Sequence, residues 1–282
     1  MNLKNMIGLG VAGNFAGHLE QAGEASDFTS VKVVESTAPK AVFPFYLPNP
    51  KGELGSYSFL SQYPISDEKL VAPSGDGDNL QMEPEICIIF DVVYNENNEV
   101  IALNPSKYSV FNDSSIRRKG AKKICEKKNW GDSTKGVGSK FNDLDSFTKD
   151  GVLNDLRIAS FIKRDNVVYA YGVDSAVADY NYNYEKLTAW LIDKMNNQKD
   201  EGPMNNIHDY LLACGKPNQA LITIGATRYT EFGQNNYLKV GDTVYVVTYN
   251  PKDVTLDEVE NMVKSDNFSD KVIRLRQEVV SK

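Results

Sequence analysis

The chain has 282 residues, of which 41% are hydrophobic and 24% charged, and its formal net charge is −7. This is the composition of a globular protein with a sizeable core. The acidic balance argues against a nucleic-acid partner, and no apolar run approaches the roughly 20 residues of a membrane helix. The three cysteines, Cys87, Cys125 and Cys214, lie far apart in the sequence. Such usage favours a reduced cytoplasm over a disulfide framework or a zinc site.

The chain carries a glycine motif near its start. Residues 8–13 read GLGVAG, the G-x-G-x-x-G spelling of a dinucleotide-binding loop. A short helix is predicted over residues 11–22, and a short strand, VKVVE (31–35), ends at Glu35, where a ribose-binding carboxylate would be expected. The strand that should lead into such a loop is almost absent, however, and the Pro- and Gly-rich stretch 38–58 indicates extended segments and loops. A dinucleotide-binding oxidoreductase is therefore a minor alternative.

The rest of the chain predicts more strands than helices. An apolar, β-branched run, ICIIFDVVY (86–94), predicts a buried strand, and a polar turn separates it from a second strand over residues 100–111. Residues 114–150 are polar and are predicted to form loops. Further predicted elements are a strand–turn–strand unit with its turn at KRDN (163–166), helices over 185–197, 207–215 and 254–265, and strands over 219–225 and 243–250. The pattern is typical of an α+β protein and lacks the repeated βαβ alternation of a nucleotide-binding sheet.

Two carboxylates stand at the entrance of the first apolar strand. Glu83 and Glu85 are two residues apart, so in an extended chain they point to the same face. Like charges side by side are costly unless a cation lies between them, and magnesium and calcium prefer carboxylate oxygens. The next strand ends in VFNDSSIRR, from which Asp113 can close over the same place. Two interpretations follow: a metal site, or exposed strand-end charges with Asp113 capping a turn.

Several segments resemble the fumarylacetoacetate hydrolase family. EPEICIIFDVV, FNDSSIR, NWGDSTKG, LITIGATRYT and YLKVGDTVYVV follow, in order and spacing, that family's E-x-E strand, N-D-x-[ST]-x-R motif, Trp–Lys segment, glycine-containing threonine loop and late G-D turn. The start, GNFAGHLEQAG, resembles the segment that carries the family's N-terminal histidine. The resemblance covers residues 7–250 and identifies the chain as a divergent branch.

This resemblance implies an α+β fold, a mixed β-sandwich or roll of the fumarylacetoacetate hydrolase C-terminal-domain type with peripheral helices. We expect a single domain over residues 1–282. Within it, residues 1–75 would form an N-terminal segment carrying the histidine, residues 76–252 the metal-binding core, and residues 253–282 a C-terminal helix. Homodimers are common in the family, so a homodimer is expected.

The resemblance also implies a metal centre. Glu83, Glu85 and Asp113 would ligate Mg²⁺, with Mn²⁺ or Ca²⁺ as alternatives. The open coordination positions would take the oxygens of a small keto or diketo acid, and the metal would act as a Lewis acid that steadies an enolate. Lys135 falls where the family has its active-site lysine, which can stabilise the enolate charge. The alternative for Lys135 is one more solvated lysine, because its stretch of the chain holds several.

Two further residues match the family's substrate-binding positions. Arg117 matches the motif's arginine, which would bind a substrate carboxylate or brace Asp113. Its alternative is a surface charge, since Arg118 stands beside it where many members have an acid. Thr227, in GATRYT, matches the family's threonine only loosely.

His18 decides the type of reaction. In hydrolytic members the corresponding histidine pairs with a glutamate three residues later, and the two activate the attacking water. This chain has Gln21 at that position, which cannot stabilise an imidazolium by charge. Glu20 is adjacent and is the predicted catalytic acid, although at i+2 it lies on the far side of a regular helix, while Glu24 could fold back. The other histidine, His208, is expected to be structural or exposed.

These residues predict a metal-dependent hydrolase that cleaves a C–C bond of a diketo or acylpyruvate-type acid. Decarboxylation or isomerisation are variants, because they need only the metal-stabilised enolate. A non-catalytic relative that binds a metabolite is the alternative, motivated by Gln21.

Overall fold

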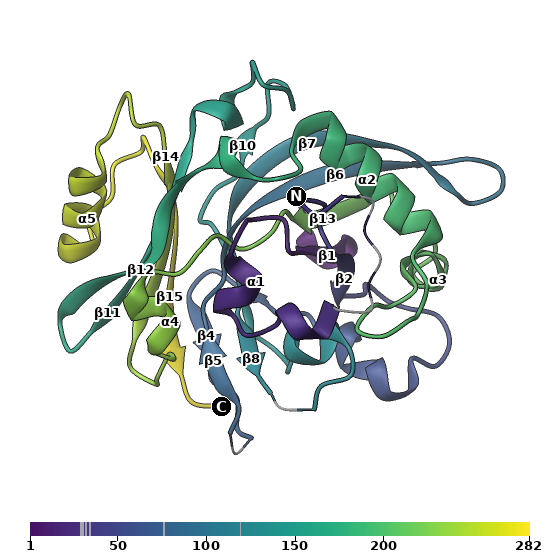
Figure 1. Cartoon of the computed structure of the whole chain (residues 1–282), viewed down its shortest axis with the longest axis horizontal. Coiled ribbons are helices and arrows are strands. Elements are labelled where there is room, and N and C mark those ends of the chain that lie inside the picture. The colour runs from purple at the N-terminus through teal and green to yellow at the C-terminus, as the bar shows by residue number, and fades with distance from the viewer. Residues whose placement is uncertain (29–30, 32, 34, 76, 119) are drawn as a thin grey trace.

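A computed structural model describes the whole chain except residues 29–30, 32, 34, 76 and 119. Two curved sheets pack against each other, with short helices at the periphery (Figure 1). Among the described residues, the larger sheet has eight strands in the order β2–β1–β13–β6–β7–β9–β3, with β10 also pairing with β7. The smaller sheet has five strands in the order β12–β11–β14–β15–β4, and β5 and β8 form a separate ribbon.

The strands have the following bounds. The larger sheet comprises β1 (Ile7–Ala12), β2 (Ala41–Tyr46), β3 (Ile65–Ser66), β6 (Pro84–Tyr94), β7 (Val100–Asn112), β9 (Lys135–Val137), β10 (Asn142–Asp143) and β13 (Gln219–Thr223). The smaller sheet comprises β4 (Lys69–Val71), β11 (Arg157–Arg164), β12 (Val167–Ala176), β14 (Thr243–Tyr249) and β15 (Ile273–Val280). The ribbon comprises β5 (Asn79–Gln81) and β8 (Ser115–Arg117). The α+β class and the sandwich-like arrangement expected from the sequence are confirmed.

The helices lie outside the sheets. The α-helices are α1 (His18–Gln21), α2 (Tyr184–Asn197), α3 (Ile207–Ala213), α4 (Glu231–Asn235) and α5 (Leu256–Ser265). The 3-10 helices are η1 (Leu3–Asn5), η2 (Ala25–Phe28), η3 (Gly55–Ser61), η4 (Ile124–Lys127), η5 (Val152–Asp155) and η6 (Val177–Asp179). In Figure 1, α2 and α3 flank the larger sheet, whereas α5 lies on the outer side of the smaller one. No helix in the described parts of the chain combines the length and apolarity needed to span a bilayer.

The glycine motif lies inside strand β1 rather than in a loop before a helix. Gly8 and Gly10 both belong to this fully buried strand. A Cβ at Gly8 would overlap the ring of Phe45, and one at Gly10 would overlap the ring of Phe43, both on the neighbouring strand β2. The glycines therefore make room for two aromatic rings. The structure gives the dinucleotide interpretation no support, because these glycines pack against side chains instead of opening a phosphate-binding turn.

One local prediction differs from the structure, and a second becomes more specific. The helix expected over residues 11–22 shrinks to α1, since β1 extends to Ala12. The stretch 38–58, which was expected to form extended segments and loops, contains the buried strand β2. The predicted strand VKVVE (31–35) falls partly outside the described residues. By contrast, the hairpin of β6 and β7 and the unit of β11 and β12 are confirmed.

The C-terminal segment ends in a strand as well as the predicted helix. After α5, strand β15 pairs with β14 and β4 in the middle of the smaller sheet. Its fully buried Gln277 accepts a hydrogen bond from Asn112 Nδ2 (3.0 Å) and donates to the carbonyl oxygens of Lys69 (2.8 Å) and Lys135 (3.0 Å). One side chain thus joins strands β4, β7 and β9 where the two sheets meet.

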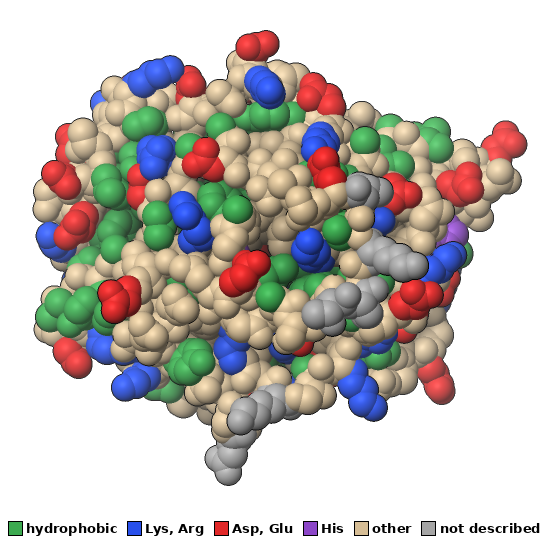
Figure 2. Space-filling model, in the orientation of Figure 1, with side chains coloured by type: hydrophobic (Ala, Val, Ile, Leu, Met, Phe, Trp, Pro, Cys, Tyr) green, Lys and Arg blue, Asp and Glu red, His purple; other side chains and the backbone are tan. Residues whose placement is uncertain are grey.

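The surface carries both signs of charge. Figure 2 shows acidic and basic side chains interspersed over the viewed face, without a broad area of one sign.

Candidate metal centre and active site

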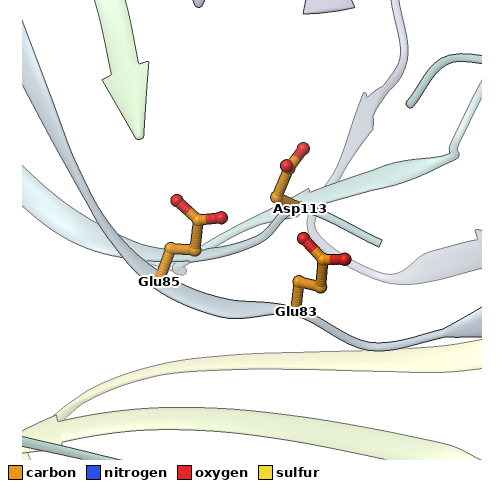
Figure 3. A group of neighbouring side chains, drawn as sticks. All are labelled: Glu83, Glu85 and Asp113. Carbon is orange, nitrogen blue, oxygen red and sulfur yellow. The ribbon is translucent and has the colours of Figure 1, made fainter. Parts of the chain in front are cut away.

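The three predicted metal ligands converge at the end of the β6–β7 hairpin. Asp113 N donates to Glu83 O at 2.9 Å, so these residues face each other across the ladder, and Glu85 follows on the same face. Carboxylate oxygens of all three lie within 4.8 Å of one another. The side chains are buried and turn to the same side of the hairpin (Figure 3). The interpretation as exposed strand-end charges is therefore wrong.

Neighbouring polar groups fix this arrangement. Asn112, the asparagine of the N-D motif, accepts hydrogen bonds through Oδ1 from Glu83 N (3.2 Å) and Ser114 Oγ (2.9 Å). The backbone N–H of Gly225 donates to Glu85 Oε2 at 2.7 Å. Burial, followed by the charge of Asp113, raises the pKa of Glu85 well above its ordinary value. Among the described residues Glu85 has no ion pair, which distinguishes it from the other two carboxylates.

Lys128 lies between two of the three carboxylates. Its Nζ donates to Glu83 Oε2 (2.5 Å) and Asp113 Oδ2 (2.7 Å), and the side chain is only 4% exposed. Burial alone would raise the pKa of Glu83, but Lys128 and Arg117 lower it far below its ordinary value. Lys128 is one of the lysines near Lys135 that were expected to be solvated, and for Lys128 this expectation is wrong. Lys128 directly follows the last residue of η4. Cys125, which is buried in η4, lies three residues before Lys128, so both side chains face the interior.

Lys135 is also buried rather than solvated. Its Nζ lies 2.8 Å from Asp113 Oδ1 and donates to Ser114 O at 2.5 Å. Burial lowers the pKa of Lys135 to about 8, against the pull of Asp113 in the opposite direction. The lysine expected from the family motif is therefore a direct partner of one predicted metal ligand.

Arg117 holds together residues from four segments. Its guanidinium donates to Glu83 Oε1 (2.8 Å), Glu24 Oε1 (2.8 Å), Gln81 Oε1 (2.7 Å) and the hydroxyl oxygen of Tyr229 (3.0 Å). A guanidinium with this many hydrogen-bond partners holds the side chains around it in place. It braces Glu83, not Asp113 as expected, and the alternative of a surface charge is wrong. Neighbouring Arg118 does lie at the surface, paired with Asp78.

His18 lies beside the carboxylates with one ring nitrogen committed. Nδ1 is 2.8 Å from the carbonyl oxygen of Thr227, and because a carbonyl only accepts, Nδ1 carries the proton. Nε2 of the neutral ring is then an acceptor. Burial lowers the pKa of His18, so the ring is neutral at pH 7. Thr227 thus positions the histidine through its backbone.

The amide of Gln21 forms its hydrogen bonds with Tyr229 rather than with the imidazole. It binds the backbone of Tyr229 at both ends, accepting from its N–H (2.8 Å) and donating to its carbonyl oxygen (3.0 Å). Glu20 is exposed and lies outside the cavity that His18 lines, which gives its predicted catalytic role no geometric support. Glu24 folds back into that cavity and pairs with Arg117 and Lys127 (2.7 Å). It is the carboxylate that shares the cavity with His18.

The cavity itself is small. Its volume is about 20 Å³, and its polar lining is His18, Glu24, Glu83, Glu85 and Lys128. That is room for about one water molecule. A wider pocket of about 260 Å³ shares Glu24 with it and opens toward solvent. Glu24 therefore lies between the buried carboxylates and the outside.

Sequence reasoning missed several residues of the site. Gln81 and Lys127 lie outside the motifs, and Tyr229 lies within GATRYT but was not singled out, because their roles arise from contacts between distant segments. For Lys128 a signal existed, namely its spacing of three from Cys125 in a helical turn.

Comparison with solved structures confirms the fold expected from the resemblance to the fumarylacetoacetate hydrolase family. Similar structures include Cg1458 with inhibitor (TM-score 0.55, 13% identity, 98% of this chain and 77% of that one). A 2-keto-3-deoxyarabinonate dehydratase gives a TM-score of 0.55 at 16% identity, covering 98% and 74%. Maleylpyruvate hydrolase from Sphingobium sp. SYK-6 gives 0.52 at 13% identity, covering 98% and 71%.

Two of these proteins have been solved with a divalent metal ion and a small ligand. The dehydratase is described in complex with magnesium and 2,5-dioxopentanoate, and the maleylpyruvate hydrolase with manganese(II) ion and pyruvate. The chain itself belongs to a family described as a family of unknown function, DUF5718, whose model matches residues 24–279. No curated protein matches its sequence.

Proposed function

We propose that this protein is a divalent-metal-dependent enzyme acting on a small keto or diketo acid. Its reaction would be hydrolysis of a C–C bond in an acylpyruvate-type acid, with decarboxylation or isomerisation as variants. The observation that carries the proposal is the buried carboxylate cluster beside a neutral histidine. The magnesium- and manganese-bound structures of the similar dehydratase and hydrolase support it.

The cluster suits a hard divalent cation. Glu83, Glu85 and Asp113 supply three carboxylates whose oxygens come within 4.8 Å of one another. This donor set fits Mg²⁺, with Mn²⁺ or Ca²⁺ as alternatives. When bound, the ion would act as a Lewis acid toward a substrate carbonyl. Lys135 would keep Asp113 in place, and Arg117 would do the same for Glu83.

The remaining groups of the cavity would handle the proton. His18 Nε2, set by the bond between Nδ1 and Thr227, would take a proton from water in hydrolysis, or from the substrate carbon in isomerisation. In this proposal Glu24 takes the place assigned to Glu20, since it shares the cavity with His18. The substrate would enter from the wider pocket past Glu24.

The test of the proposal uses the purified full-length chain, stripped with EDTA and then supplied with Mg²⁺ or Mn²⁺. We expect calorimetry to detect binding of one ion per chain, and a panel of acylpyruvates and oxaloacetate to contain a substrate whose turnover needs that ion. Absence of divalent-ion binding would contradict the proposal. Metal binding without turnover of any keto acid would favour the non-catalytic, metabolite-binding alternative.

Substitution of His18 by glutamine is expected to lower turnover by about 100- to 10,000-fold, the range for loss of a general base. Metal affinity should stay the same, because His18 is not one of the three ligands. The measurement is kcat at saturating Mn²⁺ together with calorimetric metal affinity. His208→Gln is the matched control, since His208 lies within hydrogen-bond distance of the carbonyl oxygen of Asn98, away from the site. Equal losses in both variants would argue against the assignment.

We further propose that the chain acts as a single domain, in a homodimer and in the cytoplasm. The three cysteines are free, which agrees with a reducing compartment. Light scattering after size exclusion should give about twice the 31.4 kDa of one chain. A mass equal to one chain would contradict the dimer.

A further inference from the structure

The ammonium of Lys128 stands where a cation would be expected. Among the three carboxylates, Glu83 and Asp113 each place one oxygen within 2.7 Å of Lys128 Nζ. Each also has a second basic partner on its other oxygen: Arg117 for Glu83 and Lys135 for Asp113. The pair Glu83 and Asp113 is therefore neutralised from within the chain.

An ammonium and a divalent ion would compete for these carboxylates. A metal bound by the cluster needs Glu83 and Asp113 at direct ligand distance, whereas Lys128 already donates to one oxygen of each at hydrogen-bond distance. Two cations so close together would also repel each other strongly in a buried site. Lys128 in its present position therefore opposes binding of the metal.

We propose that Lys128 is an internal counter-ion that holds the cation position of the cluster, and that a divalent ion binds only when this ammonium moves away. The inference rests on the proposed function, which makes the cluster a metal site. Lys128 then sets the metal affinity of the protein. The free energy needed to displace its ammonium reduces the net binding free energy of the ion.

The ring of Phe43 also lines the cavity beside the ammonium. Its centroid lies 5.0 Å from Lys128 Nζ, within the range of a cation–π contact. This contact adds to the ion pairs that hold the ammonium in the cluster.

The neighbouring Lys127 provides a matched control. It is buried like Lys128 and adjacent in sequence, but its Nζ pairs with Glu24 (2.7 Å) and Asp27 (3.1 Å) instead of the cluster. Removing Lys128 leaves Arg117 and Lys135 on the carboxylates, so the cluster keeps part of its compensation. Lys128→Met retains the length of the stem and removes only the charge.

The experiment titrates Mn²⁺ into full-length wild type, Lys128→Met and Lys127→Met by calorimetry at one pH. We expect Lys128→Met to bind Mn²⁺ about tenfold more tightly or better, a change of about 1.4 kcal/mol or more. Lys127→Met should stay near the wild-type affinity. Thermal unfolding gives a second readout: saturating Mn²⁺ should raise the Tm of Lys128→Met more than that of the wild type.

Wild type that binds Mn²⁺ with the same or higher affinity than Lys128→Met would overturn the inference and leave the proposed function intact. An equal gain in Lys127→Met would overturn it too, since general loss of positive charge would then be the cause. Absence of Mn²⁺ binding in all three proteins would instead contradict the metal site itself, and the inference with it. If Lys128→Met does not fold, Lys128→Gln serves as the second variant under the same criteria.

Discussion

Replacement of Glu85 by glutamine is expected to abolish divalent-ion binding, and turnover with it, while the protein stays folded. The change is nearly isosteric and removes one of three anionic ligands, and a hard ion has no equally good substitute nearby. The fold should tolerate it because Glu85 has no ion pair among the described residues, and a glutamine oxygen can still accept from the N–H of Gly225. Calorimetry with Mn²⁺ and thermal unfolding of the metal-free protein measure the two effects.

The same substitution at Glu83 is expected to have a different effect on stability. The two oxygens of Glu83 hold Arg117 and Lys128, so Glu83→Gln leaves buried cations without their counter-charge. Breaking a buried pair in this way typically costs about 3–5 kcal/mol. We expect Glu83→Gln to lose both metal binding and stability, and Glu85→Gln to lose metal binding alone. Unaltered Mn²⁺ affinity in Glu85→Gln would refute its role as a ligand, and the exposed Glu278→Gln serves as the control substitution.

Valine at Gly8 is expected to destabilise the fold by about 1–3 kcal/mol or more, as overpacking of a tight core does. The new Cβ would overlap the ring of Phe45, which is fully buried and cannot swing into solvent. Chemical unfolding of the metal-free protein measures the loss. If the glycine served a bound dinucleotide instead, stability without a ligand would hardly change.

A double substitution isolates the contact behind the loss at Gly8. Phe45→Ala alone leaves a cavity and should cost about 3–5 kcal/mol. Combined with Gly8→Val, the branched side chain moves into the vacated space, so the double variant should lose less than the sum of the two single changes. Strict additivity would show that the two positions do not interact as the structure indicates.

The convergence of Glu83, Glu85 and Asp113 could be predicted because it follows from local geometry. The alternation of a strand places Glu83 and Glu85 on one face, and the predicted hairpin returns the chain so that Asp113 meets them. The β-branched run of β6 made that hairpin recognisable. The basic residues of the site were harder to predict. A lysine is expected to be solvated unless a carboxylate from a distant segment is known to face it. Lys128 and Lys135 each meet partners through the fold, not through the sequence nearby.

Two of the strands that were not predicted show different reasons. Strand β2 contains Pro44, which counts against a strand, but β2 lies at the edge of its sheet, where a missing N–H is tolerated. Strand β15 showed the signal in its sequence: Ile273, Leu275, Gln277 and Val279 alternate as buried positions. Gln277 is the polar residue among the buried positions of β15. Its burial is explained by its hydrogen bonds to the other strands, which the sequence does not show.

The hydrogen bonds of Gln277 connect the order in which the chain folds with the carboxylate cluster. Gln277 bonds Asn112, and Asn112 in turn holds the backbone of Glu83, so the last strand of the chain supports the first ligand of the cluster. During synthesis the carboxylates and their lysines emerge long before β15 does. Until that strand pairs, Asn112 lacks the partner that ties it to the smaller sheet, so this part of the support for Glu83 forms late in folding. A chain that stops before β15 would therefore hold Glu83 less firmly than the complete fold does.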